Sequence, residues 1–374
     1  QKRVLKEIRK DTLSGSQMNR LLQGDVGSGK TMVALLSMLM GVDNGFQSAL
    51  MAPTEILAQQ HFTGIQEMLE PLGLKVDILT GSVKGKKRKE VLAKIVNGEV
   101  DILIGTHALI EPTVIFKNLG IVVIDEQHRF GVQQRAQLRT KSVIPPHILV
   151  MTATPIPRSL AMVFYGDLDY SVIDELPPGR KPIKTLHKRD AHRLAVYGFM
   201  RDEIAKGRQI YIVYPLIEES EKSDLASLME GYESLIKIFP IPQYHISVVH
   251  GKMKPEFKEL EMQQFVNHKT HILVATTVIE VGVNVPNASV MVIENAERFG
   301  LSQLHQLRGR VGRGAEQSFC ILMTGDKLSS DSKVRIQTMC DTNDGFKVSE
   351  VDLDLRGPGD IEGTQQSGDI QLKI

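Results

Sequence analysis

The sequence predicts two α/β domains in tandem, each built on a parallel sheet flanked by helices, with a short helical hairpin and a loop at the C-terminal end. Short apolar runs alternate with longer amphipathic stretches along most of the 374 residues, and such alternation of strand with helix is typical of doubly wound folds. The runs are apolar without interruption, as parallel strands are when both faces are buried. The alternation pauses in the segment 175–184, which contains three prolines, and this pause divides the chain.

The first domain is expected to span residues 1–185. Its strands are predicted at the apolar runs Ser48–Ala52, Asp101–Gly105, Leu119–Asp125 and His147–Thr152. Its helices are predicted at the amphipathic stretches Thr31–Met40, Glu55–Leu72 and Lys84–Asn97.

The second domain is expected to span residues 186–330, where the same alternation resumes. Its strands are predicted at Gln209–Val213, Ile246–His250, His271–Thr276, Ser289–Ile293 and Ser318–Leu322. Its helices are predicted at Pro255–Asn267 and Ser302–Arg308. In the remaining residues, 331–374, we expect a helical hairpin over Asp331–Asp344 and a sharp loop at Arg356–Gly359.

The composition is that of an ordinary globular protein, with 42% hydrophobic and 24% charged residues. It excludes a wholly disordered chain and a disulfide scaffold, since Cys320 and Cys340 are the only cysteines and are expected to be buried small residues. The formal net charge is only +1, so any nucleic-acid contact must come from a local patch. No apolar run is long enough to span a membrane. The chain begins with Gln1, not Met, and we therefore expect a fragment.

A phosphate-binding loop is predicted at Gly24–Thr31, which fits the pattern G-x-x-x-x-G-K-[ST] in full. An apolar pair precedes the loop and a helical pattern follows it, which is the strand–loop–helix context that such a loop needs. Gly24, Gly27 and Gly29 would let backbone N–H groups approach phosphates. Lys30 would reach the β- and γ-phosphates of ATP, and Thr31 would hold Mg²⁺.

A second metal ligand is predicted at the end of the strand Ile121–Ile124, which is followed by Asp125 and Glu126. Open parallel sheets bind ligands at the carboxyl ends of their strands. Asp125 would orient Mg²⁺, and Glu126 would polarise the attacking water.

These two motifs together resemble the superfamily 2 helicases and translocases, because Asp125-Glu126-Gln127-His128 is a DExH box. The resemblance implies two RecA-like domains that use ATP and Mg²⁺. The other motifs of that superfamily follow in its order at Pro53-Thr54-Glu55, Thr80-Gly81, Gly105-Thr106-His107, Thr152-Ala153-Thr154, Thr276-Thr277 with Glu280, Gly282 and Asn284, and Gln306–Arg313.

The resemblance also implies residue roles in the nucleotide site. Gln1 would read the adenine, and Gly282 would contribute to nucleotide binding. His128 would link the ATP site to Thr152 and Thr154. The second domain would supply Gln306, Arg310 and Arg313. The two arginines are three residues apart and are therefore expected on one face of a helix. The nucleotide site would then be complete only when the two domains close. Taken alone, such arginines are more often a solvated helix face or a structural ion pair.

The candidate nucleic-acid contacts are turns that end predicted strands, where hydroxyls and backbone amides suit phosphate oxygens and carry no base information. They are Pro53, Thr54, Thr80, Gly81, Thr106, His107, His250, Thr276 and Thr277. Taken singly, each is more often an ordinary turn or helix cap. The basic run Lys84–Lys89 is either a solvated helix start or a duplex phosphate contact.

The amino-acid sequences of these motifs resemble those of the RecG-type branched-DNA translocases. The resemblance covers the whole chain and includes the segments Asp174–Lys181 (DELPPGRK) and Arg356–Gly359 (RGPG). This resemblance implies a bacterial, cytoplasmic, monomeric motor that moves on double-stranded DNA and drives branch migration of replication forks and Holliday junctions in recombination and repair, with single-stranded-DNA-binding protein as a further partner. Arg335, Arg356 and Gln366 would couple the ATPase to DNA movement. Gln365 and Asn284 depart from the family pattern, and nothing resembles the family's N-terminal wedge domain.

Three alternatives remain open, and one of them is an RNA helicase. The transcription-repair coupling translocases share much of this sequence pattern, although they usually have Phe at the position of Ser28 and Glu at that of Gln127. A nucleotide-dependent nucleic-acid clamp with little turnover would need Glu126 or the arginine pair to be lost, and all of these residues are present.

Overall fold

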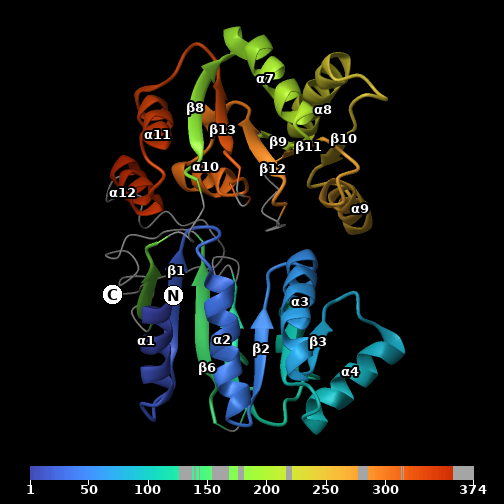
Figure 1. Ribbon diagram of the computed structural model, residues 1–374, viewed down its shortest axis with the longest axis vertical. Helices are drawn as coiled ribbons and strands as arrows, with labels where there is room; N and C mark the ends of the chain where they lie inside the picture. Colours follow the sequence, from blue (N-terminus) through green and yellow to red (C-terminus); the bar gives the residue numbers. More distant parts are fainter. Residues whose placement is uncertain are drawn as a thin grey trace. The chain divides into compact units, whose positions relative to one another are not determined.

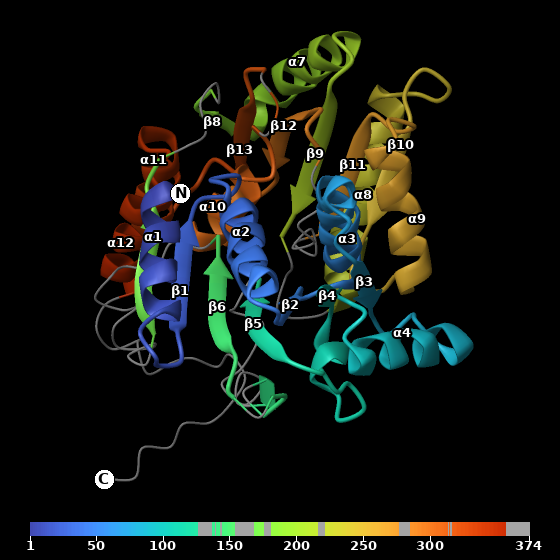
Figure 2. The same ribbon diagram turned by 60° about the horizontal axis from the view of Figure 1, so that its bottom comes forward.

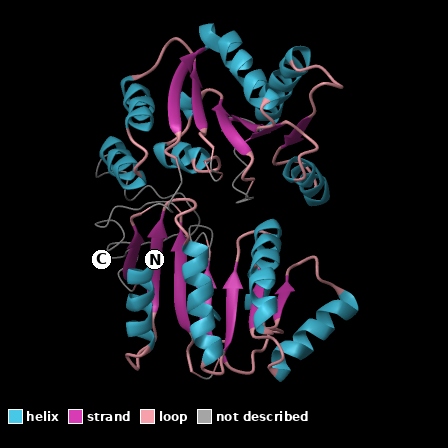
Figure 3. Cartoon of the chain, viewed as in Figure 1, coloured by secondary structure: helices cyan, strands magenta, loops and turns pink. Residues whose placement is uncertain are grey.

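The computed structural model describes residues 1–125, 137–138, 140–142, 144–153, 168–175, 181–215, 221–276, 285–312, 314 and 316–356. The chain forms two compact units: unit 1 comprises Gln1–Arg180 with the later segments Gly251–Val266 and Val278–Pro286, and unit 2 comprises the remainder. Helices and strands alternate in both units (Figure 3). The division of the chain at residues 185 and 330 stays a prediction.

Unit 1 contains a seven-stranded sheet, in which every described pair of neighbouring strands is parallel. The strand order is β3-β4-β2-β5-β6-β1-β7. The strands are β1 (Asn19–Gly24), β2 (Gln47–Met51), β3 (Val76–Leu79), β4 (Ile102–Gly105), β5 (Leu119–Ile124), β6 (His147–Thr152) and β7 (Asp169–Ile173).

The helices of unit 1 cover both faces of this sheet, and because successive side chains of a strand point to opposite faces, two apolar clusters form. Buried residues of α1 (Lys2–Thr12), α2 (Lys30–Asp43) and α3 (Glu55–Leu69) share one cluster with one face of the sheet, and these helices lie along the sheet in Figures 1 and 2. Residues of α4 (Gly85–Asn97) and of the 3₁₀ helix η2 (His107–Ile110) pack in the other cluster. A second 3₁₀ turn, η1 (Glu70–Leu72), follows α3.

Unit 2 contains a six-stranded sheet in the order β10-β11-β9-β12-β13-β8, and its described strand pairs are also parallel. The strands are β8 (Lys184–Arg189), β9 (Gln209–Tyr214), β10 (Ile246–Val249), β11 (Ile272–Thr276), β12 (Ala288–Ile293) and β13 (Phe319–Thr324). The helices of unit 2 are α7 (Arg193–Ala205), α8 (Glu221–Ile238), α10 (Leu301–Arg308), α11 (Ser330–Asp341) and α12 (Gly345–Arg356), with 3₁₀ turns η4 (Asp190–His192) and η5 (Ala296–Arg298). The helix α9 (Pro255–Val266) lies between β10 and β11 in sequence but falls in the later segment Gly251–Val266 of unit 1.

The predicted fold class, two α/β domains with parallel sheets, is confirmed. The predicted hairpin is longer than expected: α11 ends at Asp341 and a second helix, α12, continues to Arg356. The predicted loop that starts at Arg356 lies outside the described residues from 357 onward. None of the helices in the described part of the chain has the length and apolarity that crossing a bilayer requires.

Candidate nucleotide site and nucleic-acid surface

The loop Gly24–Thr31 joins the end of β1 to the start of α2, as a phosphate-binding loop does. Gly27 and Gly29 have φ angles of 77° and 91°, in the left-handed region that only glycine adopts readily. A Cβ atom at Gly24 would lie 2.6 Å from Ser28 Oγ. The three glycines are therefore required by the backbone path that brings the N–H groups of this loop together at the helix N-terminus.

Lys30 is the first residue of α2 and is only 9% exposed. Its ammonium group donates hydrogen bonds to the carbonyl oxygens of Gly24 at 2.6 Å and Asp25 at 2.9 Å, so the cation is held inside the loop. Ser28 Oγ is buried in the same loop and has no hydrogen-bond partner. Thr31 follows in the exposed first turn of α2. A buried cation, an unsatisfied hydroxyl and a helix N-terminus fit the triphosphate of a nucleotide.

Gln1 lies against this loop from the N-terminal end of α1. Its Nε2 donates to the carbonyl oxygen of Ser28 at 2.9 Å, and a Cβ atom at Gly29 would lie only 2.0 Å from that Nε2. The helix is held in place by Arg20 of β1, whose guanidinium bonds Asp11 at 2.6 Å and Ser171 Oγ at 2.8 Å. The sequence analysis missed Arg20, although an arginine within an apolar strand is a signal for a buried ion pair.

Asp125 lies at the same edge of the sheet as the phosphate loop, directly after β5. The strand order places β6 between β5 and β1, and Thr152 at the end of β6 pairs with Gln23 of β1. Asp125 N–H donates to the carbonyl oxygen of Met51 at 2.9 Å, and Asp125 Oδ2 lies 2.9 Å from His61 Nε2. The sheet thus brings Asp125 and buried Thr152 to the edge that carries Lys30. Glu126, His128 and Thr154 lie outside the described residues.

A resident metal site is not apparent in the part of the chain that the structure describes, where no group of three or more His, Cys, Asp or Glu side chains could hold an ion. This finding does not conflict with Thr31 and Asp125 as magnesium ligands, because Mg²⁺ bound with a nucleotide keeps several waters and uses one or two protein groups. Burial raises the pKa of the Cys320 thiol to about 12 and also raises that of Cys340. Both cysteines therefore remain protonated, as small structural residues do.

Three candidate nucleic-acid turns in unit 1 follow the neighbouring strands β3, β4 and β2. Pro53 and Thr54 lie between β2 and α3, and Thr54 Oγ1 accepts the N–H of Leu57 at 3.3 Å as the cap of α3. The hydroxyl of Thr54 thus serves as a helix cap, the more ordinary of its two predicted roles.

The other two turns lie beside it. Thr80 is buried, and its Oγ1 lies 2.8 Å from Ser82 Oγ, while Gly81 separates the two residues. Thr106 is also buried, with an Oγ1 that lacks a partner, and the exposed His107 follows it in η2. The sheet therefore brings together the turns that the sequence predicted separately.

The basic run Lys84–Lys89 forms the start of α4. Arg88 is bound to Glu111 at 2.6 Å, whereas Lys84, Lys86, Lys87 and Lys89 are exposed. This arrangement is compatible with both predicted roles, a solvated helix start and a contact with duplex phosphates.

In unit 2, His250 and Thr276 lie at the ends of the neighbouring strands β10 and β11. Thr276 is buried and its Oγ1 has no partner. Thr277 and Gly282 lie outside the described residues. Of the predicted motif that runs from Thr276 to Asn284, the structure thus places only Thr276.

The prediction that Arg310 and Arg313 share a face of one helix is wrong. The helix α10 carries the half-buried Gln306 but ends at Arg308, and Arg310 lies in the following turn, where it is 8% exposed. Gly309 caps the helix and Gly312 has a φ angle of 77°, so these glycines end the helix before the second arginine. Arg313 itself lies outside the described residues.

The helix α10 is bound to the C-terminal hairpin by polar contacts. Arg308 is 2% exposed and donates to the carbonyl oxygens of Met339 at 3.0 Å and Thr342 at 2.7 Å. Ser302 Oγ donates to Asp352 of α12 at 2.9 Å. The sequence analysis missed Arg308, whose only signal was its place within the motif.

Arg335, a predicted coupling residue, connects α11 to the turn before α10. It donates to the carbonyl oxygens of Phe299 at 2.7 Å and Glu297 at 3.1 Å. Arg356 ends α12, and Gln366 lies outside the described residues. The hairpin and the helix that carries Gln306 are therefore one packed assembly.

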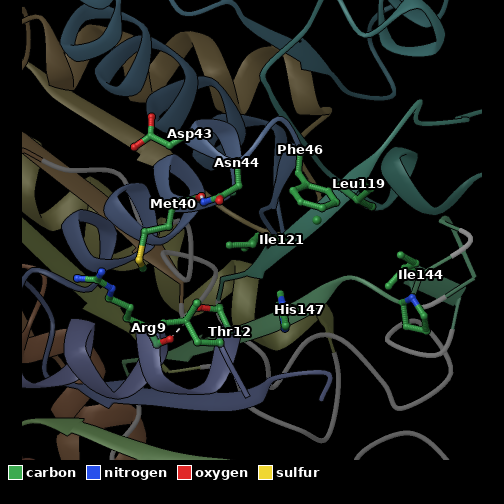
Figure 4. Close-up of a pocket in the computed structure, with 14 residues that line it drawn as sticks. Arg9, Thr12, Met40, Asp43, Asn44, Phe46, Leu119, Ile121, Ile144 and His147 are labelled. Atoms are coloured by element: carbon green, nitrogen blue, oxygen red, sulfur yellow. Dashed lines mark hydrogen bonds between the residues drawn. The ribbon is translucent and has the colours of Figure 1, made fainter. Parts of the chain in front are cut away.

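A separate apolar cavity of about 570 Å³ lies at the amino ends of β5 and β6 (Figure 4). Met40, Phe46 and Ile121 line it, with His147 at its wall. Burial lowers the pKa of His147, whose Nδ1 accepts the N–H of Met18 at 2.9 Å. The cavity contains none of the predicted site residues, since those of unit 1 gather at the carboxyl ends of the strands.

Comparison with known proteins agrees with this geometry. The DEAD/DEAH box helicase model matches residues 1–163, and the helicase conserved C-terminal domain model matches residues 192–315. A third model, ATP-dependent DNA helicase RecG, domain 3, C-terminal, matches residues 342–374. The fold, the phosphate loop and these matches define a two-domain helicase of the DEAD/DEAH box class.

The most similar relatives narrow this class. ATP-dependent DNA helicase RecG of Bacillus subtilis is 53% identical over 100% of this chain and 54% of the relative, and that of Synechocystis is 55% identical over 98% and 44%. A structure of RecG bound to a three-way DNA junction has a TM-score of 0.83 at 46% identity, covering 96% of this chain and 47% of that one. The chain belongs to the RecG family, and it spans about half the length of the curated relatives it matches.

More distant structures agree in fold alone. Dbp5 of Saccharomyces cerevisiae has a TM-score of 0.65 at 19% identity, covering 94% of this chain and 92% of that one. The resemblance to superfamily 2 and to the RecG type is confirmed by the matches above.

Proposed function

We propose that this chain is the ATP-dependent motor of a RecG-type translocase that moves on double-stranded DNA and drives branch migration of replication forks and Holliday junctions in recombination and repair. The observation that carries the proposal is the carboxyl edge of the sheet in unit 1. This edge presents the phosphate loop and Asp125 beside three turns that suit nucleic-acid backbones, in a chain about half identical to RecG proteins along its length.

ATP use follows from the family, and the residues of unit 1 fit the nucleotide. Lys30 would neutralise the β- and γ-phosphates, and Gln1 would contact the base. Mg²⁺, held by Thr31 and Asp125, would neutralise charge on the phosphates. Glu126 would orient the attacking water.

Gln306, Arg310 and Arg313 would stabilise the charge that spreads over the transferring phosphoryl group. Gly282 would complete the nucleotide contacts, and His128, Thr152 and Thr154 would relay the state of the nucleotide. The hairpin residues Arg335, Arg356 and Gln366 would transmit it to DNA.

The nucleic-acid contacts would be made by Pro53, Thr54, Thr80, Gly81, Thr106 and His107 in unit 1, and by His250, Thr276 and Thr277 in unit 2. Backbone amides and hydroxyls at these turns would grip phosphates without reading bases, which movement along any sequence requires. The exposed lysines of the run Lys84–Lys89 would add a salt-dependent contribution to binding. In the cell the motor would act in the cytoplasm as a monomer, with single-stranded-DNA-binding protein as a partner.

The test is ATP turnover by this chain in the presence of single strands, duplexes, forks, four-way junctions and RNA of equal length. We expect branched and duplex DNA to stimulate turnover most. Equal or greater stimulation by RNA would contradict a DNA motor, and tight DNA binding with no turnover would support a clamp.

A further inference from the structure

The helix α3 connects two parts of the carboxyl edge of unit 1. Its N-terminal cap is Thr54, in one of the candidate nucleic-acid turns. About two helical turns further along α3, the Nε2 atom of His61 lies 2.9 Å from the Oδ2 atom of Asp125. The six steps of helix from Glu55 to His61 span about 9 Å. One rigid element thus runs from the nucleic-acid turns to the predicted metal ligand.

The contact between His61 and Asp125 is well sheltered, since the two side chains are 11% and 13% exposed. An ionised carboxylate can only accept hydrogen bonds, so the Nε2 atom of His61 donates. The bond engages the Oδ2 atom of Asp125. Carboxylates that bind metals are commonly held in place by hydrogen bonds from neighbouring groups, whose loss weakens metal affinity.

The N-terminal end of α3 is also joined to a second candidate turn. Glu55 Oε1 accepts the N–H of Ser82 at 3.0 Å, and a Cβ atom at Gly81 would lie 3.1 Å from the same oxygen. The turn Thr80–Ser82 therefore rests on the first residue of α3. Phosphates that bind at this turn or at Thr54 act on the N-terminal end of the helix.

A displacement of the N-terminal end of α3 can be transmitted along the helix because α3 is packed rigidly against the sheet. Leu57, Ala58, Ile65 and Leu69 are buried in the cluster that α3 shares with the sheet. Packed cores of this kind do not deform gradually, so a small shift at one end of the helix is expressed at the other.

From these contacts we propose that His61 is a positioning residue for the magnesium ligand Asp125, and that α3 makes this position depend on nucleic acid bound at the turns 53–54 and 80–82. The proposal rests on the proposed function, because it deepens the roles given there to Asp125 and to the two turns. It assigns to His61 a role that no sequence motif gave it. DNA would stimulate ATP turnover by fixing the metal carboxylate through Glu55, α3 and His61.

The first test measures the affinity of the chain for Mn²⁺ in the presence of ADP, by electron paramagnetic resonance and without DNA. Three variants are compared: His61→Leu removes the donor, His61→Gln keeps an N–H donor, and Gln66→Leu alters an exposed residue of the same helix. We expect His61→Leu to weaken Mn²⁺ binding about 10–100-fold, His61→Gln to restore part of it, and Gln66→Leu to bind as the parent chain does. Unchanged Mn²⁺ affinity in His61→Leu would overturn the positioning role.

The second test addresses the coupling, with Glu55→Ala as the variant and a three-way DNA junction as the probe. We expect Glu55→Ala to keep the Mn²⁺ affinity of the parent chain but to lose most of the stimulation of ATP turnover by DNA. Full stimulation in Glu55→Ala would overturn the coupling. If His61→Leu fails to fold, His61→Gln and Glu55→Ala still decide the two claims.

The two tests also distinguish this proposal from the proposed function. If the unaltered chain shows no DNA-stimulated turnover, the motor function and the coupling both fail. The Mn²⁺ measurement still judges His61 in that case, because it requires neither DNA nor hydrolysis.

Discussion

The two units carry their predicted ATP residues in different settings. In unit 1, Lys30 and Gln1 are bonded to the phosphate loop itself. In unit 2, Arg310 lies in a turn after α10, a helix that is bound to the C-terminal hairpin through Arg308. From this difference we expect unit 1 to bind the nucleotide and unit 2 to contribute to the rate of its hydrolysis. Four substitutions test this comparison of the two units.

The largest effect is expected for Lys30→Ala. The substitution removes the buried cation that is held within the phosphate loop, so both nucleotide affinity and ATP turnover should be lost. Fluorescence titration with a labelled nucleotide and an ATPase assay with a DNA junction measure the two quantities. Lys237→Ala, which alters an exposed lysine of α8, is the matched control. Turnover at the parent rate in Lys30→Ala would rule out this loop as the nucleotide site.

Arg310→Ala should lower turnover while nucleotide affinity is kept. Arginines that stabilise a transferring phosphoryl group contribute about 10³–10⁵-fold to the rate, and the ATPase assay with DNA should show a loss of that order. The exposed Arg298 of η5 offers the control Arg298→Ala. If DNA-stimulated turnover survives in Arg310→Ala, unit 2 has no part in the chemistry, and if binding is lost instead, the division of labour is wrong.

Arg308→Met should destabilise unit 2. The buried carbonyl oxygen of Met339 and the partly buried one of Thr342 would lose their donor, and a buried group without its partner costs about 1–3 kcal/mol. Urea denaturation should therefore show the free energy of unfolding reduced by about 3 kcal/mol. A change below about 0.5 kcal/mol, as at ordinary surface sites, would show that the hairpin is not held through this residue.

Of these substitutions, Arg20→Met should have the smallest effect. It should lower the free energy of unfolding less than Arg308→Met does, and it should separately weaken the binding of ATP. The two carboxylate partners of Arg20 are partly exposed, Asp11 at 20% and Glu7 at 36% of the side chain, so water can solvate them after the substitution, and the buried Ser171 hydroxyl keeps its bond to Glu7. Because Arg20 holds α1, which carries Gln1, the Michaelis constant for ATP should rise more than the maximal rate falls. Steady-state kinetics at several ATP concentrations separate the two, and a lower rate at an unchanged Michaelis constant would contradict this role of Arg20.

The sequence predicted the interior of both sheets better than their edges. The central strands β2, β4, β5 and β6 are mostly apolar and almost wholly buried and were found, as were their counterparts in unit 2. The edge strands β3, β7 and β8 were missed because one side of an edge strand is exposed, and β8 in particular reads Lys-Thr-Leu-His-Lys-Arg. The helix α1 was missed because it buries only Val4 and Ile8 among many charged residues.

The candidate site was predictable to the extent that its residues are adjacent in sequence. The phosphate loop and Asp125 could be placed from their flanking strands. The contact of His61 with Asp125 joins residues 64 positions apart, and Arg308 reaches a carbonyl 31 positions away. Such contacts depend on how helices pack on the sheet, which local patterns do not determine. The helix end at Arg308 depends on Gly309 and Gly312, whose spacing alone does not reveal which of them ends a helix.

The strand β2 lies between two parts of the carboxyl edge of unit 1. One part follows β5 and carries Asp125, and the other follows β4 and carries the turn at Thr106. On one side Met51 O accepts the amide of Asp125, and on the other the amide of Ala52 donates to Gly105 O at 2.8 Å. Met51 and Ala52 are fully buried, so the single peptide group that joins them, which bonds both neighbouring strands' ends, cannot relax toward solvent when either neighbour moves. We therefore expect Met51 and Ala52 to tolerate little change in side-chain size, whereas an exposed residue of the turn after β4, such as His107, should tolerate substitution without loss of the nucleotide site.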